Sequence, residues 1–321
     1  MSLFTKAPPH HLRAFSGLTK NVHRTSSKSE RKQRNQIVNS SPSKPTASSL
    51  TTLTKSATNP SIAILTMVNP RKLNGWTQPM MEAMHRDFAA ASHDANIKGV
   101  VVTGEGSYYS AGVDLSGTIK PMAPKALQHM IRTKNQLVFD TFLDFPKPLV
   151  VAVNGAAIGA SVTTATLSDA IVACKESSFN TPFTRLGVPP EGCSSVHFEF
   201  LMGKETAARM LGKEGWVPNG EEAAKVGLVT KCVDKSVLVE EAVNLCSSLA
   251  TSNAPRTAMG QTDLAMMKSV NAKESADLAD AFLSEKFLSA QASFLEKKGK
   301  TVPAMVFKFL VATRFAWSKL L

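Results

Sequence analysis

The chain has 321 residues, of which 43% are hydrophobic and 19% charged, with a net charge of +12. The basic excess belongs to the two ends. Residues 1–59 hold ten Lys or Arg and one acid, residues 297–321 hold six and none, and the stretch between is net acidic. Because a nucleic-acid-binding core carries its positive charge on the folded domain, this distribution argues against nucleic acid as a partner. There is no run of eighteen apolar residues, so no bilayer-spanning helix is expected.

The first 59 residues are rich in Ser, Thr, Lys and Arg and lack sustained apolar periodicity. Such a segment cannot bury enough apolar surface to offset its ordering entropy, so we expect residues 1–59 to form a disordered leader. Its basic, hydroxylated opening, with no acid before Glu30, is typical of an organelle transit peptide. We therefore expect a mitochondrial location, with a tail that carries no address as the alternative.

Short apolar runs rich in β-branched residues recur from Ser61 onward. They predict buried strands over residues 61–68, 97–104, 148–155 and 169–174. Between the first two, apolar residues at helical spacing predict an amphipathic helix over Thr77–Asp94, and helical patterns dominate from Lys204 onward. This alternation predicts an α/β fold with buried strands and a helical C-terminal region.

Two loops rich in small residues directly follow two of these strands. "EGSYYSAGVDLSG" comes after residues 97–104, and "AAIGASVTTAT" comes after residues 148–155. Backbone N–H groups are free where a chain leaves a strand and begins a helix. Two such groups from separate loops can converge on one oxygen and form an oxyanion hole, which small residues allow a ligand to approach.

At these loops the sequence resembles the crotonase superfamily, the enoyl-CoA hydratase/isomerase family. The resemblance spans about residues 61–300 and rests on the motifs "NPRKLN", "SAGVDL", "PLVVAVNGAAIGA", "SDAIVAC", "FNTPFTRLGVPPEG" and "EEAAKVGLVTKCV", in this order. It implies a spiral of ββα repeats and a catalytic domain over residues 60–300. It also implies an acyl-CoA substrate with no separate cofactor, and assembly as a homotrimer or a hexamer.

In that family two backbone N–H groups hold the thioester oxygen, and the matching positions are Val113 and Ala160. The resemblance also assigns substrate contacts, which fall on Ala111, Gly112, Asp114, Leu115, Arg71 and Lys72. The first four lie beside the acyl-CoA and the two basic residues lie near its nucleotide end. The alternatives are a turn residue for the aspartate and solvated turn charges for the basic pair.

The two glutamates of the family's hydratases fall on Thr163 and Phe183, neither of which can activate water. Glu191, in "PEGCSS", instead resembles the single base of the peroxisomal-type Δ3,Δ2-enoyl-CoA isomerases. We expect an apolar pocket around it, which raises its pKa toward working pH. The residues expected to supply that surface are Phe183, Leu186, Pro189 and Pro190. The resemblance thus implies isomerisation of 3-enoyl-CoA to 2-trans-enoyl-CoA in fatty-acid breakdown.

Other chemistries find less support in the pattern. Ser194 and Ser195 are not in a G-x-S-x-G elbow, and Cys193 is interpreted as a small packing residue. The four cysteines have no CxxC spacing and no histidine pair flanks a carboxylate cluster, so no metal is assigned. The alternatives are another crotonase-type acyl-CoA enzyme, either a hydrolase or an atypical hydratase, or a non-catalytic binding module.

Residues 301–321 are apolar with spaced basic residues, Lys308, Arg314 and Lys319. We expect a C-terminal helix that packs on its own or a neighbouring subunit, with a membrane-surface helix as the alternative. Within it, Ser318–Leu320 spell "SKL", but Leu321 follows, whereas a peroxisomal address is read at the extreme C-terminus. A peroxisomal location is therefore the second expectation.

Overall fold

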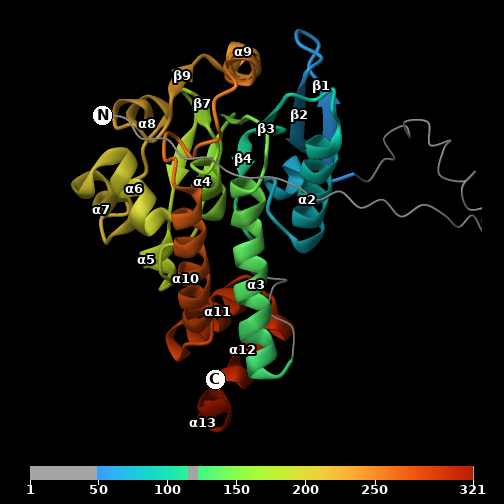
Figure 1. Cartoon of the computed structure of the whole chain (residues 1–321). Coiled ribbons are helices and arrows are strands. Elements are labelled where there is room, and N and C mark those ends of the chain that lie inside the picture. Colours follow the sequence, from blue (N-terminus) through green and yellow to red (C-terminus); the bar gives the residue numbers. More distant parts are fainter. Residues whose placement is uncertain (1–48, 115–121, 321) are drawn as a thin grey trace, which may run out of the picture. The chain divides into compact units, whose positions relative to one another are not determined.

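The computed structural model describes residues 49–114 and 122–320 (Figure 1). Within them, a mixed sheet has the strand order β1-β2-β3-β5-β7-β9, in which β1 is antiparallel to β2 and all other neighbours are parallel. These strands are, in that order, Thr51–Lys55, Ile62–Met67, Gly99–Gly104, Leu149–Val153, Ala170–Cys174 and Lys231–Val233. The four strands expected from apolar runs are β2, β3, β5 and β7, so those predictions are confirmed.

A second, smaller parallel sheet has the order β4-β6-β8, with strands Tyr108–Ser110, Ala156–Ile158 and Ser178–Asn180. Each of its strands directly follows a strand of the larger sheet, so the chain repeats a step from the first sheet to the second. This is the ββα spiral that the resemblance implies. Because β4 and β6 are neighbours, the loops that leave them are brought together at one place.

The central strands of the larger sheet are covered on both faces. Every residue of β3, β5 and β7 is buried. Alternate side chains such as Val101, Val150 and Val172 pack with α9 (Leu238–Ser252), while their neighbours belong to a second apolar cluster that includes α2 (Gln78–His93). Successive side chains point to opposite faces of the sheet, and both faces are buried. These segments are therefore continuously apolar. The helix predicted over residues 77–94 is α2.

Two long helices, α3 (Pro124–Leu143) and α10 (Leu264–Phe282), pack side by side and extend from the sheets (Figure 1). They are followed on the C-terminal side by α11 (Glu285–Lys297), α12 (Thr301–Ala312), α13 (Arg314–Trp317) and the 3-10 turn η4 (Ser318–Leu320). A separate apolar cluster joins α3 to these helices, through residues such as Ile131, Leu278, Phe287 and Phe307. The remaining short elements are η1 (Pro70–Lys72), α4 (Ala160–Ala165), α5 (Phe183–Leu186), α6 (Ser194–Met202), α7 (Lys204–Leu211), α8 (Gly220–Lys225) and η3 (Lys235–Val237).

One expected boundary is wrong. Folded structure begins before residue 60, because Thr51–Lys55 pairs along its whole length with β2 and Thr51 donates a hydrogen bond to Asp87 at 2.6 Å. Edge pairing and one buried polar contact hold this polar strand, and neither produces apolar periodicity. The rest of the predicted leader, residues 1–48, lies outside the described residues.

Residues 301–320 form two helices and a 3-10 turn, where one helix was expected. They belong to the same compact unit as the sheets, residues 47–321. One side of α12 buries Ala304 and Phe307, whereas Met305 and Phe309 are exposed. In the described part of the chain, none of the helices combines the length and apolar character needed to span a bilayer.

Candidate active site

Glu191 lies in a sharp turn directly before α6. The next two residues, Gly192 and Cys193, have φ values of 65° and 66°. A Cβ at position 192 would collide with the Phe139 ring and lie 2.7 Å from the Thr163 hydroxyl oxygen, so glycine is required here. Ser194 donates its hydroxyl hydrogen to the Glu191 carbonyl oxygen at 2.7 Å, which closes the turn. The "EGCS" sequence thereby fixes where the glutamate leaves the backbone.

The Glu191 side chain is almost completely buried, with the residue only 8% exposed. Burial, and then the charge of the neighbouring Glu274, raises the pKa of Glu191 from 4.5 to about 8. A side-chain hydrogen bond with Asn135 of α3 acts in the opposite direction. A carboxyl group with this pKa can accept a proton near neutral or mildly alkaline pH and hold it in a following step.

Glu191 lines a cavity of about 80 Å³ together with both loops that follow the second sheet's strands. Three loop residues, Ala111, Gly112 and Val113, contribute one wall, and the segment Ile158–Ala160 contributes another. The rest is mostly apolar, with Pro182, Phe183, Leu186, Val188, Leu278, Phe282 and Phe287. The structure therefore brings the expected carboxylate and both expected amide positions to one cavity.

The two loops touch each other at Gly112, whose φ is +75°. A Cβ there would collide with the Ile158 carbonyl oxygen and lie 3.7 Å from the Ala160 nitrogen. Ala160 is the first residue of α4, so its N–H has no intrahelical acceptor. Among the described residues, neither the Val113 nor the Ala160 amide donates to a main-chain carbonyl. Two available N–H donors thus lie on loops in direct contact.

A second cavity, of about 70 Å³, is also lined by Glu191. It shares Val113, Glu191, Leu278 and Phe282 with the first cavity. Helices α2 and α3 supply its remaining wall through Met81, Ile131, Lys134, Asn135 and Val138. The carboxyl group therefore lies where two mostly apolar spaces meet.

The other expected contacts are more scattered. Arg71 and Lys72 are exposed on η1 and line neither cavity. Their loop is nevertheless attached to the site, because the Ala111 N–H donates to the Leu73 carbonyl at 2.9 Å. Asp114 is exposed beside the first cavity.

Three residues expected at the site are not among those that line these cavities. Leu115 lies outside the described residues. Pro189 and Pro190 do not line either cavity, so that part of the expected pocket is wrong. Val188 and the α10 residues Leu278 and Phe282 supply the apolar surface instead, because α10 packs over the turn that holds Glu191.

No second carboxylate joins Glu191 among the described residues that line these cavities. Thr163 is fully buried and donates its hydroxyl hydrogen to the Ala160 carbonyl at 3.3 Å, and Phe183 contributes only a ring. Cys193 donates its thiol hydrogen to the Met267 carbonyl, and burial raises the pKa of that thiol. Within residues 49–114 and 122–320, no group of three His, Cys, Asp or Glu side chains could hold a metal ion.

Comparison with known protein families decides the affiliation. Residues 57–301 match the family described as enoyl-CoA hydratase/isomerase. The chain belongs to the enoyl-CoA hydratase/isomerase family. Human enoyl-CoA delta isomerase 2 is 35% identical over 241 residues, which cover 72% of this chain and 60% of the human protein. This chain therefore matches less than two thirds of that relative's length.

Two further similarities extend this result. Mouse peroxisomal enoyl-CoA delta isomerase 3 is 32% identical over 250 residues, covering 74% of this chain and 77% of the mouse protein. The crystal structure of an enoyl-CoA hydratase/isomerase from Pseudoalteromonas atlantica superposes with a TM-score of 0.64 at 26% identity, covering 77% of this chain and 97% of that one. The predicted crotonase-type fold with a helical C-terminal region is thereby confirmed.

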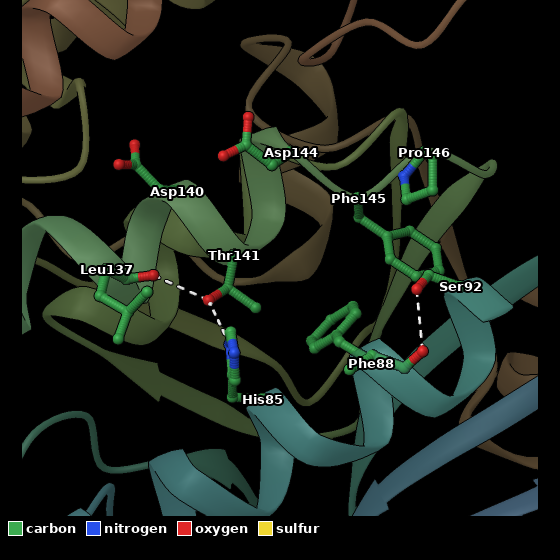
Figure 2. Close-up of a pocket in the computed structure, with 10 residues that line it drawn as sticks. His85, Phe88, Ser92, Leu137, Asp140, Thr141, Asp144, Phe145 and Pro146 are labelled. Carbon is green, nitrogen blue, oxygen red and sulfur yellow. Dashed lines mark hydrogen bonds between the residues drawn. The ribbon is translucent and has the colours of Figure 1, made fainter.

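This family member has a further hollow of about 180 Å³ between α2 and α3 (Figure 2). Its polar groups mostly pair with one another: Thr141 donates to the Leu137 carbonyl at 2.7 Å and lies 3.2 Å from His85 Nδ1. Asp144 forms an ion pair with Lys268. Neither Glu191 nor the two loop amides line this hollow, so it is not the site assembled around the glutamate.

Sequence reasoning missed the side chains that α3 and α10 bring to Glu191, above all Asn135 and Glu274. A weak signal was present in α10, whose buried face runs through Met267, Asn271, Glu274, Leu278 and Phe282 at helical spacing. An amide and a carboxylate on the otherwise apolar face of a helix indicate a buried polar contact. The pattern does not reveal the partner, because the Cys193–Glu274 contact spans 81 positions.

Proposed function

We propose that this chain is a Δ3,Δ2-enoyl-CoA isomerase in which Glu191 moves the proton. One observation carries the proposal: a single buried carboxyl group shares an apolar cavity with two loops whose Val113 and Ala160 amides are available as donors. The resemblance to enoyl-CoA delta isomerases at 35% and 32% identity supports the same reaction class.

In the proposed mechanism, ionised Glu191 removes a proton from C2 of a 3-enoyl-CoA. The electron pair of that bond moves toward the thioester, and negative charge collects on the thioester oxygen. The N–H groups of Val113 and Ala160 stabilise that charge, and one such donor is typically worth about 10²–10³-fold in rate. Glu191, now protonated, returns the proton to C4, which leaves the double bond between C2 and C3.

The raised pKa suits this two-way transfer. An ordinary carboxylate is too weak a base to remove an α-proton efficiently, whereas one with a pKa of about 8 is a better acceptor. Hydration is less well supported, because adding water uses a second acid/base group and the described lining residues offer no other carboxylate. Arg71 and Lys72, on a loop tied to the site, are the proposed contacts for the phosphates of CoA.

The test is turnover of a 3-enoyl-CoA by the purified full chain, followed by the ultraviolet absorbance of the conjugated product. We expect wild-type protein to produce the absorbance rise and Glu191→Gln to lower kcat by roughly 10²–10⁴-fold, the range for loss of a general base. Glu199→Gln is the matched control, since it changes an exposed glutamate on the adjacent helix α6.

The alternatives give different signals in the same assay. Hydration of a 2-enoyl-CoA removes absorbance, and hydrolysis releases a free thiol. A wild-type protein that gives no absorbance rise with any 3-enoyl-CoA would contradict the isomerase proposal. Full activity in Glu191→Gln would contradict the assignment of the base alone.

A further inference from the structure

The turn that holds Glu191 is fixed by a carboxylate from a distant helix. The Cys193 N–H donates to Glu274 Oε2 at 2.6 Å, and the Ser195 N–H donates to Glu274 Oε1 at 2.9 Å. Cys193 is the N-cap of α6 and makes no side-chain cap of its own. Glu274 therefore accepts from two N–H groups at the start of α6, where the helix itself supplies no acceptor.

Glu274 is itself held in place, with the residue 4% exposed. Its helix, α10, is bonded to α3 through Asn271, whose Nδ2 donates to the Gln136 carbonyl at 3.0 Å and to Asp140 Oδ1 at 2.9 Å. One turn further, Asn135 donates to the Ser275 hydroxyl at 3.2 Å. The carboxylate is thus presented from a helix pair and not from a movable loop.

We propose that Glu274 is a positioning residue for the base: both of its oxygens hold the turn after Glu191, and its negative charge beside Glu191 favours proton capture by that carboxyl group. The inference rests on the proposed function, in which Glu191 is the base. Glu274 touches no cavity that would hold substrate, because it lines neither of the two spaces that meet at Glu191.

The charged groups around this pair can be named. Glu274 is the charged group that acts on Glu191, Lys134 of α3 lines the second cavity with it, and Asn135 from α3 is its neutral hydrogen-bond partner. Glu274 in turn has Asp277 and Lys273 nearby on α10, and both of these are exposed and paired with each other. From α3, Asp140 acts on the Cys193 thiol. Burial raises the pKa of Glu274, but its two N–H donors oppose that rise and favour the ionised form.

The test is the pH profile of isomerisation in Glu274→Gln. The amide removes the charge and presents an NH₂ group to one of the two N–H donors, so the turn loosens. We expect kcat to fall at least tenfold with KM changed less than twofold. Because the like charge that favours protonated Glu191 is gone, the acid limb of kcat/KM moves to lower pH by about one unit.

Two further variants separate the two effects. Glu274→Asp keeps the charge but is one methylene too short to reach both amides, so we expect a lower kcat with an unshifted acid limb. Asp277→Asn removes an exposed carboxylate from the same helix and is expected to leave both quantities as in wild type. If Glu274→Gln does not fold, the Asp variant alone decides, since a wild-type kcat in it overturns the positioning claim.

The outcomes also separate this inference from the proposed function. An acid limb at the wild-type pH in folded Glu274→Gln overturns the charge effect, while an unchanged kcat overturns the effect on geometry. In both cases we still expect Glu191→Gln to lose most of the activity, and the isomerase proposal stands. If wild-type protein does not isomerise 3-enoyl-CoA at all, the proposed function fails first.

Discussion

The two halves of the candidate site are built in different ways. One half consists of the loops after β4 and β6, which contribute backbone N–H groups at Val113 and Ala160. The other half consists of α3 and α10, which contribute side chains, namely Asn135 beside the carboxyl group and Glu274 beneath its turn. Glu191 lies between the halves and depends on both.

This difference determines how each half tolerates change. In the loop half, position depends on the close approach of two backbones, which at Gly112 leaves no room for a side chain. In the helical half, position depends on buried polar groups that satisfy one another, and the loss of one partner leaves another unpaired. Substitutions should therefore affect the loop half sterically and the helical half electrostatically.

The largest effect expected within the loop half is from Gly112→Ala. Its φ is +75°, and the new Cβ would collide with the Ile158 carbonyl oxygen, so the two loops would separate. We expect kcat/KM for a 3-enoyl-CoA to fall about 10²–10³-fold, the size of a lost oxyanion donor. Gly215→Ala is the matched control, because its φ is +59° and a Cβ there meets nothing within 4 Å. Equal losses in the two variants would mean that backbone strain, and not loop contact, is responsible.

A smaller effect is expected on stability from Glu191→Gln. The pKa of Glu191 is about 8 in the folded chain and near 4.5 when unfolded, so ionisation of the folded form is unfavourable. Wild type therefore loses stability as pH rises from about 4.5 to about 8, and the uncharged glutamine does not. Above pH 8 we expect the variant to be more stable by at most about 5 kcal/mol, the full shift at about 1.4 kcal/mol per pKa unit, with little difference near pH 4.5.

The measurement is the difference in Tm between Glu191→Gln and wild type at pH 5 and at pH 9. Groups that titrate in both proteins cancel in this difference. Glu199→Gln, exposed on α6, should give the same Tm difference at both pH values. A Glu191→Gln advantage that shrinks toward pH 9 would show that burial does not oppose ionisation of this carboxyl group.

The loop half could be predicted from the sequence and the helical half could not. Strands β2, β3, β5 and β7 are continuous apolar runs, and the loops beside them carry glycine and alanine where backbones approach closely. Such signals are local, because the strand, the glycine and the free N–H group lie within a few residues of one another in the sequence. The position of Glu191 in its turn was also readable from "PEGCSS".

Elements held by partners far along the chain were missed for a physical reason. Strand β1 is polar and is defined by pairing with β2, while β4, β6 and β8 are three residues each, too short for a period to be visible. Glu274 occupies a helix face that differs from an ordinary buried one only by its polarity. Its partner amides are identified only once α10 is packed on α6.

The smallest expected effect tests whether the second cavity, at the helical half, receives part of the acyl chain. Val138 on α3 lines the 70 Å³ cavity together with Glu191, so Val138→Ala should enlarge it. We expect the ratio of kcat/KM for a long 3-enoyl-CoA to that for a short one to rise about fivefold, or about 1 kcal/mol. The adjacent Leu137 is 51% exposed and lines the separate hollow of Figure 2, so Leu137→Ala is the matched control. If both variants raise the ratio equally, the preference for chain length depends on the stability of α3. If only Val138→Ala raises it, the side chains that line this cavity limit the length of the acyl chain directly.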